Sequence, residues 1–220
     1  MIKLSHIYKT YNGPVHALRD ISFEIEKGEF VFLTGPSGAG KTTLFRMISA
    51  FDKPTSGKVS VGNFSIDELT NAEIPYYRRK VGVVFQDFKL LKNKTIFENV
   101  ALPLSIRGDS TDSIYNKVMD TLDLLGIKQK YNQYPEFVSG GEQQRTAIAR
   151  SIIHQPFVLI ADEPTGNLDH SLAQDIMKIL EQICAQGTTV FVATHDTYLI
   201  DKYKKRRIEI KDGELVGGSS

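Results

Sequence analysis

The chain has 220 residues, of which 41% are hydrophobic and 24% are charged. These proportions are those of a globular protein that buries its own core, and they exclude a disordered or fibrous chain. Lys and Arg together number 27 against 26 Asp and Glu, so no general excess of positive charge is available to bind nucleic acid. The only cysteine, Cys184, excludes an intrachain disulfide and a cysteine-rich metal site.

Membrane-spanning and secretory segments are absent from the pattern. The longest unbroken apolar run, residues 157–161, has five residues, whereas a membrane-spanning helix needs about 20. Residues 1–6 have neither the apolar stretch nor the small-residue cleavage site of a secretory signal. We therefore expect a cytoplasmic protein that has no membrane span of its own.

The first segments of the chain predict an antiparallel β leaf. Residues 2–11 and 15–25 have the composition of strands, and the turn residues Asn12, Gly13 and Pro14 separate them. We expect this leaf to precede the main sheet.

Four short, nearly continuous apolar runs predict that main sheet. They are residues 30–33, 81–85, 157–161 and 189–193. Runs of this kind are typical of parallel strands buried on both faces, and helical segments separate most of them. Towards the end of the chain, a turn at residues 211–214 joins two short runs and predicts a terminal hairpin. An α/β core follows from this order.

A helical region interrupts the α/β pattern. Ile114, Val118, Leu122 and Leu125 recur at spacings of four, four and three residues, and no strand signal appears nearby. We therefore expect one domain over residues 1–220, with a helical subdomain inserted into the core. Its predicted parts are residues 1–87 and 156–216 for the core with its leaf, 88–155 for the helical subdomain, and 217–220 for a tail.

Residues 35–42 match the pattern Gly-x-x-x-x-Gly-Lys-Thr between an apolar run and a helical segment. The glycines of such a loop let backbone N–H groups surround a phosphate at a helix N-terminus. Lys41 adds a positive charge at the β and γ phosphates, and Thr42 offers a hydroxyl to Mg²⁺. The predicted phosphate-binding residues are Gly35, Pro36, Ser37, Gly38, Ala39, Gly40, Lys41, Thr42 and Thr43.

Two carboxylates, Asp162 and Glu163, follow the apolar run 157–161. They are expected at the carboxyl edge of the sheet, where open α/β sheets bind their ligands. Together with the phosphate-binding loop, Asp162 is predicted to support Mg²⁺, and Glu163 is predicted to orient and deprotonate an attacking water. The alternative is a pair of solvated acids at a strand end.

The segment 138–145, Val-Ser-Gly-Gly-Glu-Gln-Gln-Arg, resembles the signature loop of the ABC-type ATPases. Further residues that mark this family occur in the expected order, namely Tyr11, Gln86, Asp169 and His195. The resemblance implies a P-loop NTPase (RecA-like) core with a β leaf and an inserted helical subdomain. It also implies ATP and Mg²⁺ as ligands, and a head-to-tail homodimer in which each ATP lies between one chain's loop 35–42 and the other chain's signature loop.

The resemblance also implies roles for single residues. Tyr11 is expected to stack on adenine, although Tyr8 is a rival and ordinary packing is an alternative. Gln86 is expected to ligate Mg²⁺ through its carbonyl oxygen, and Asp169 to line the nucleotide site. His195 is expected to donate a hydrogen bond to the γ-phosphate, with helix capping as its alternative role.

The signature loop itself is expected to bind through Ser139, Gly140 and Gly141, which would present a helix N-terminus to the γ-phosphate. Glu142 departs from the usual glutamine, and phosphate would repel its charge. We therefore expect Glu142 to face ribose hydroxyls or solvent.

Three segments resemble a particular branch of the family. The sequence Glu-Gln-Gln at 142–144 looks like the branch that contains cell-division, lipoprotein-releasing and macrolide-efflux ATPases. Residues 71–79 and 195–200 look most like the cell-division members. The implied function is ATP hydrolysis coupled to an integral membrane subunit, through which the chain contacts the membrane. An ATPase for lipoprotein release or drug efflux is the rival, and an ATP-clamped scaffold with negligible turnover is another.

Two surface features have open interpretations. The basic run at residues 202–207 is either a solvated face or a contact with anionic lipid. The apolar residues Phe85, Phe88, Leu90 and Leu91, on either side of Gln86, either line a groove for a partner's helix or belong to the core.

Overall fold

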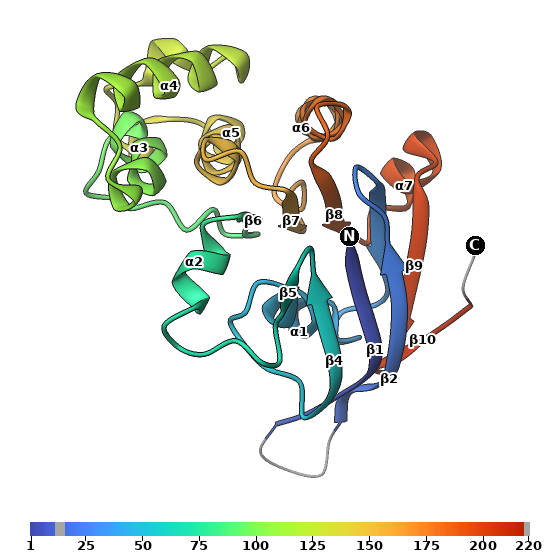
Figure 1. The fold of residues 1–220 in the computed structure, drawn as a ribbon. Helices are drawn as coiled ribbons and strands as arrows, with labels where there is room; N and C mark the ends of the chain where they lie inside the picture. Colours follow the sequence, from blue (N-terminus) through green and yellow to red (C-terminus); the bar gives the residue numbers. More distant parts are fainter. Residues whose placement is uncertain (12–15, 218–220) are drawn as a thin grey trace.

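The computed structural model describes residues 1–11 and 16–217 and contains two sheets (Figure 1). The smaller one is an antiparallel leaf with the strand order β2-β1-β4-β5. Its strands are β1 (Ile2–Thr10), β2 (His16–Ile25), β4 (Ser56–Val61) and β5 (Phe64–Ser65). The predicted leaf is confirmed, but its two further strands, β4 and β5, were not predicted. The predicted turn at residues 12–14 lies outside the described residues.

The larger sheet has the strand order β10-β9-β3-β8-β7-β6. Its strands are β3 (Phe30–Thr34), β6 (Val81–Val84), β7 (Val158–Asp162), β8 (Thr189–Ala193), β9 (Arg206–Lys211) and β10 (Glu214–Leu215). All four predicted apolar runs form neighbouring parallel strands. The terminal hairpin β9–β10 is also present, and β9 pairs in parallel with β3, which the sequence pattern did not indicate.

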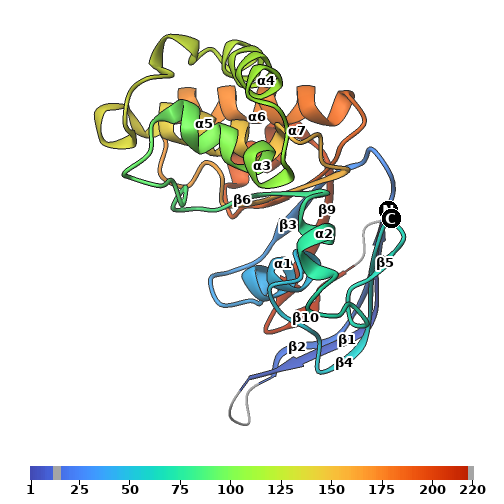
Figure 2. The same ribbon diagram turned by 60° about the vertical axis from the view of Figure 1, so that its left-hand side comes forward.

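Side chains from both faces of the main sheet are buried, as the continuous apolar runs predicted. In β3, Val31 and Leu33 belong to one hydrophobic core, which the leaf and α1 (Lys41–Ile48) complete. Phe30 and Phe32 point to the opposite face and join a second core, which is formed with the longer helices. The main sheet is thus the middle layer of the molecule, with α1 between it and the leaf (Figure 2).

Helices cover the other face of the sheet (Figure 2). They are α3 (Ile96–Arg107), α4 (Thr111–Leu124), α5 (Gly140–Ile152), α6 (His170–Ala185) and α7 (Thr197–Tyr203), and the short η1 (Lys128–Lys130) and η2 (Pro135–Phe137) lie between α4 and α5 in the chain. The short α2 (Ile74–Arg78) instead packs on the leaf side, where Tyr77 joins the first core. The predicted apolar positions Val118, Leu122 and Leu125 are buried. No helix in the described part of the chain has the length and apolar character needed to cross a membrane.

Candidate functional site

A cavity of about 480 Å³ opens at the carboxyl edge of the main sheet. The four parallel strands β3, β6, β7 and β8 end here, so the segments that follow them converge, as in other open α/β sheets. Its lining consists of Ala17, Pro36, Ser37, Gly38, Ala39, Gly40, Lys41, Thr42, Thr43, Gln86, Asp162, Glu163 and His195. All of these except Ala17 are predicted site residues.

The loop between β3 and α1 needs glycine where the chain passes close to other backbone. Gly35 has φ +146°, and a Cβ atom there would lie 2.0 Å from the carbonyl oxygen of Ile210 in β9. Gly40 has φ +107°, and its Cβ would lie 2.8 Å from the carbonyl oxygen of Ala17. Only glycine fits both the conformation and the space, so the terminal hairpin and the start of β2 shape the loop from behind.

The loop presents its positive groups to the cavity. The Lys41 ammonium donates hydrogen bonds to the carbonyl oxygens of Gly35 (2.7 Å) and Pro36 (3.1 Å), and the residue is buried. Helix α1 begins at Lys41, and no side chain caps its first N–H groups. Uncapped N–H groups at a helix N-terminus, together with an ammonium group, form a site for anions such as phosphate.

Thr42 and Asp162 join the loop to the end of β7. The Thr42 hydroxyl donates a 2.9 Å hydrogen bond to Oδ2 of Asp162. Burial raises the pKa of the Asp162 carboxyl and the nearby Glu163 charge adds to the rise, whereas the Thr42 hydrogen bond and Lys41 oppose it. A divalent cation would relieve the cost of this buried negative charge.

The donors at this point fit Mg²⁺. Thr42, Gln86 and Asp162 all offer oxygen atoms, which Mg²⁺ prefers. Within residues 1–11 and 16–217, no three His, Cys, Asp or Glu side chains are grouped as a metal cluster. An ion held here would complete its shell with water or phosphate oxygens, as is usual for Mg²⁺ in phosphoryl-transfer sites.

Glu163 and His195 form a hydrogen-bonded pair at the mouth of the cavity. Oε1 of Glu163 lies 2.8 Å from Nδ1 of His195, and the Glu163 side chain is only 11% exposed. Because a carboxylate can only accept, Nδ1 carries the hydrogen, and in a neutral ring Nε2 is then an acceptor. His195 therefore donates to a phosphate as an imidazolium ion or after it leaves Glu163.

The backbone holds Glu163 in an unusual conformation. Its φ is +48°, in the left-handed region that non-glycine residues rarely adopt. Two hydrogen bonds fix it there, from its own N–H to the carbonyl oxygen of Ala193 and from the N–H of Gly166 to its carbonyl oxygen. The carboxylate is thereby aimed by β7 and β8 rather than left on a loose loop.

The signature segment does not reach this cavity in the same chain. Ser139 caps α5, and both Ser139 and Gly140 are exposed. Gly141 is buried beneath Leu172, with which a Cβ atom at Gly141 would be in close contact. The first turn of α5 thus presents its N-terminus to the surface, apart from the phosphate-binding loop.

The structure shows a role for Glu142 that we did not predict. Its half-buried carboxylate accepts a 2.8 Å hydrogen bond from the Ser139 N–H, while the Ser139 side chain accepts from the Glu142 N–H. This is a capping box, and the Ser-x-x-Glu spacing was a readable signal for it. The backbone hydrogen bond from Ser139 lowers the pKa of Glu142, and Lys130 lowers it further. The contact of Glu142 with ribose hydroxyls stays a prediction.

Two predicted nucleotide contacts, Tyr11 and Asp169, lie off the cavity lining. Tyr11 is 45% exposed, and its hydroxyl donates to Asp52 at 2.9 Å. Tyr8 is also exposed, so neither tyrosine is ordinary core packing. The Asp169 carboxylate caps α6 by accepting from the Leu172 N–H. The nucleotide roles of Tyr11 and Asp169 stay predictions.

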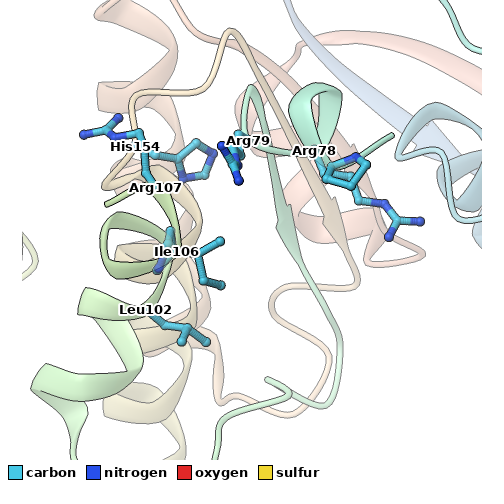
Figure 3. Close-up of a pocket in the computed structure, with 8 residues that line it drawn as sticks. Arg78, Arg79, Leu102, Ile106, Arg107 and His154 are labelled. Atoms are coloured by element: carbon cyan, nitrogen blue, oxygen red, sulfur yellow. The ribbon is translucent and has the colours of Figure 1, made fainter. Parts of the chain in front are cut away.

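A second hollow surface lies beside the Gln86 segment. None of the four apolar residues Phe85, Phe88, Leu90 and Leu91 is buried, and Phe85 and Leu91 line a cavity of about 390 Å³. Next to it, a pocket of about 280 Å³ is lined by Leu102 and Ile106 of α3, with Arg78, Arg79 and Arg107 around it (Figure 3). Of the two interpretations of these residues, the groove is the one that their exposure favours.

The basic run at residues 202–207 is largely paired within the chain. Lys205 forms an ion pair with Glu181 at 2.6 Å, and Arg206 with Glu29 at 3.0 Å. Lys202 donates to Gln174. These contacts favour the solvated face over the lipid contact, because the paired charges are less available to an anionic surface.

Comparisons with known proteins agree with this geometry. The family model described as "ABC transporter" matches residues 18–166. The chain is 49% identical to the cell division ATP-binding protein FtsE of Bacillus subtilis, over 100% of this chain and 96% of the relative. It is 48% identical to FtsE of Mycobacterium tuberculosis (98% and 94%) and 44% identical to that of Escherichia coli K12 (99% and 98%).

A solved structure shares the whole fold. The dimeric ATP-binding cassette MJ0796, in a post-hydrolysis state bound to ADP and Pi, aligns with a TM-score of 0.91 and 36% identity over 99% of this chain and 97% of that one. With the phosphate-binding loop, the two carboxylates at the end of β7 and the signature helix all in place, the chain belongs to the ABC transporter family and is an ABC-type ATPase.

Proposed function

We propose that two copies of this chain close head to tail on two ATP molecules and hydrolyse them with Mg²⁺ in bacterial cell division. The observation that carries the proposal is the separation within one chain of the phosphate cavity from the exposed signature segment at Ser139. A second copy can supply that segment to the cavity. The cell-division role is supported by identities of 44–49% to proteins named FtsE.

One group of cavity residues binds the phosphates and Mg²⁺, and a second group carries out the reaction. Lys41 and the N–H groups of the loop hold the phosphates. Thr42 and Gln86 would hold Mg²⁺, with Asp162 accepting the Thr42 hydroxyl behind it. The ion supplies neutralisation of the charge that develops on the phosphate oxygens.

The reaction falls to the pair Glu163 and His195. The Glu163 carboxylate orients a water for attack on the γ-phosphate and accepts its proton, and its low exposure restricts competing solvent. His195 steadies Glu163 through Nδ1 and, when protonated, donates from Nε2 to a γ-phosphate oxygen.

Residues of the partner chain and a contact with the adenine ring complete each site in this proposal. The α5 N-terminus at Ser139, Gly140 and Gly141 covers the γ-phosphate bound by the other copy. Asp169 contributes at the same interface, Glu142 caps the helix there through Ser139, and residues 88–155 form the subdomain that carries this helix. Tyr11 stacks on adenine, which its exposed ring permits.

The output of the cycle is mechanical. We propose an integral membrane subunit of the FtsX type as partner, with this chain at the cytoplasmic face of the inner membrane and septal cell-wall hydrolysis as the result. The groove lined by Phe85 and Leu91, together with the pocket shown in Figure 3, offers apolar surface for a segment of that subunit.

Replacing Glu163 by glutamine tests the reaction. The amide keeps the shape of the carboxylate but accepts no proton, so kcat should fall by about 10² to 10⁴ while ATP still binds. The ATP-bound dimer should also persist longer in size-exclusion chromatography. Glu68→Gln, an exposed site in the loop after β5, is the matched control. Turnover of Glu163→Gln at the parental rate would remove Glu163 from its role.

The partner and the output have their own test. We expect a membrane protein to co-purify from detergent-solubilised membranes and to stimulate phosphate release. Attachment to a lipoprotein-releasing or efflux subunit would replace the cell-division role with transport. If phosphate release stays negligible both with and without the membrane protein, the chain is an ATP-clamped scaffold.

A further inference from the structure

Helix α5 contains a buried amide that packing alone does not explain. Gln144 is 0% exposed, and its Nε2 donates a 2.6 Å hydrogen bond to the carbonyl oxygen of Pro164. Its Oε1 is buried and has no hydrogen-bond partner among the described residues. An unpaired buried oxygen costs stability, so an apolar residue of equal volume would suit a purely structural position better.

The acceptor of this hydrogen bond lies next to the proposed base. Pro164 follows Glu163, whose backbone is held in the left-handed region by bonds to Ala193 and Gly166. The hydrogen bond from Gln144 fixes the next peptide along the chain. Three points therefore define the direction of the Glu163 carboxylate, and α5 supplies one of them.

The same helix grips the segment that follows Gln86. The Arg150 guanidinium donates two 2.7 Å hydrogen bonds, to the carbonyl oxygens of Phe88 and Lys89. Both of those residues have positive φ, at +58° and +49°, which is strained for non-glycine residues. The two bonds from one planar group hold this strained backbone, and with it the approach of Gln86 to the cavity.

Helix α5 thus connects three parts of the site: the segment beside Glu163, the segment after Gln86 and the signature loop at its own N-terminus. Gln144 and Arg150 are six residues apart on α5, a rise of about 9 Å. The N-cap of the helix is Ser139, where the triphosphate bound by the proposed partner chain would lie. Each of the segments beside Glu163 and Gln86 is hydrogen-bonded to this helix. A displacement of the helix N-terminus would therefore move both segments together.

We infer that Gln144 and Arg150 are positioning residues, through which the signature helix sets the backbone beside Glu163 and beside Gln86 in its own chain. This inference rests on the proposed function. Neither side chain lines the phosphate cavity, so neither is placed to touch ATP or the attacking water. They make the two halves of the site respond as one when the helix N-terminus engages a γ-phosphate.

The experiment compares substitutions on one helix. Gln144→Met keeps the volume and removes the donor. Arg150→Lys keeps the charge but not the double hydrogen bond, and Arg150→Met removes both. Thr146→Val is the control, because Thr146 is equally buried and its hydroxyl bonds only within α5, to the Glu142 carbonyl oxygen. Each full chain is measured for its unfolding midpoint, its affinity for a fluorescent ATP analogue, and its kcat.

For Gln144→Met we expect kcat to fall about tenfold or more while nucleotide affinity stays within about twofold, since small misplacements of reacting groups mainly slow chemistry. At position 150 we expect kcat to be highest with Arg, intermediate with Lys and lowest with Met, so that lysine retains part of the activity that methionine loses. Thr146→Val should retain the parental kcat.

Two outcomes would overturn the inference. One is a folded Gln144→Met or Arg150→Met chain with the kcat of the control. The other is a fall of kcat and affinity together with the unfolding midpoint, which a merely structural role produces. Failure of the proposed function is distinct, because the unsubstituted chain would then fail to bind ATP or to release phosphate.

Discussion

The phosphate-binding loop and the signature segment are both glycine-rich turns that open a helix, yet the chain treats them differently. The loop at residues 35–42 is enclosed by β2 and β9 and lines a cavity with Asp162 at the end of β7 and Glu163 directly after it. The segment at residues 138–142 is capped by its own Ser139 and Glu142 and faces outward. The first region is therefore complete within one chain, whereas the second supplies half of a site.

The carboxylates of the two regions have pKa values shifted in opposite directions. Burial raises the pKa of Asp162 in the cavity, whereas the backbone N–H of Ser139 lowers the pKa of Glu142 at the helix N-terminus. Charge is costly to the folded chain at the first position and favourable at the second. The cavity thus favours a bound cation, and the helix N-terminus is already partly neutralised.

Lys41→Met should have the largest effect on nucleotide affinity, and it tests the contribution of the loop to ATP binding. Loss of a charge-assisted hydrogen bond to phosphate should weaken ATP binding by about 10- to 100-fold, measured by titration at concentrations where the chain is monomeric. Lys58→Met, at an exposed position of β4, is the control. Unchanged affinity would remove Lys41 from the groups that hold phosphate.

Asp162→Asn tests the cost of the buried negative charge in the cavity. Since the folded chain raises the pKa of Asp162, ionisation destabilises it, and stability falls as the pH rises from about 4 through the folded value. The amide should therefore raise the thermal midpoint near pH 7 by a few degrees, and the gain should vanish near pH 4. Thermal unfolding without nucleotide measures this. A lower midpoint at pH 7 would contradict it.

Glu142→Gln has the smallest expected effect and sharpens the account of the helix N-terminus. Glutamine retains the capping box but removes a negative charge from the surface that meets the triphosphate, so the ATP-bound dimer should tighten about two- to fivefold. Sedimentation of the variant in a Glu163→Gln background measures this.

The same variant has a stability signature. The Glu142 pKa is lowered in the folded chain, so its contribution is present above about pH 4.5 and is lost as the pH falls. The glutamine variant should lose less stability on acidification. A dimer weaker than the parent's would place the carboxylate among the groups that bind ATP.

Local patterns predicted the parts of the fold whose signal is contained in a short window. The runs that became β3, β6, β7 and β8 are apolar because both faces are covered, and the loop at 35–42 has a fixed spacing. The cavity residues followed from them, since parallel strands end at one edge. The Ser139–Glu142 capping box is equally local, and its Ser-x-x-Glu spacing indicates it, but repulsion between Glu142 and phosphate does not.

Long-range pairing was beyond these patterns. In β4, only Val59 and Val61 alternate clearly, and nothing in so short a segment specifies pairing with β1. The parallel pairing of β9 with β3 joins residues about 175 positions apart in sequence, which periodicity does not encode. Gln144 and Arg150 were likewise unpredictable, because their acceptors are backbone carbonyls that the tertiary fold brings to them.

The terminal hairpin has a consequence for biosynthesis. β9 lies beside β3, and the N–H of Gly213 donates to the carbonyl oxygen of Ala39 within the phosphate-binding loop. A ribosome delivers residues 35–42 early and residues 206–213 late, so the loop is translated long before its supporting wall exists. We therefore expect the nascent chain to bind nucleotide only after residues 206–213 have left the ribosome.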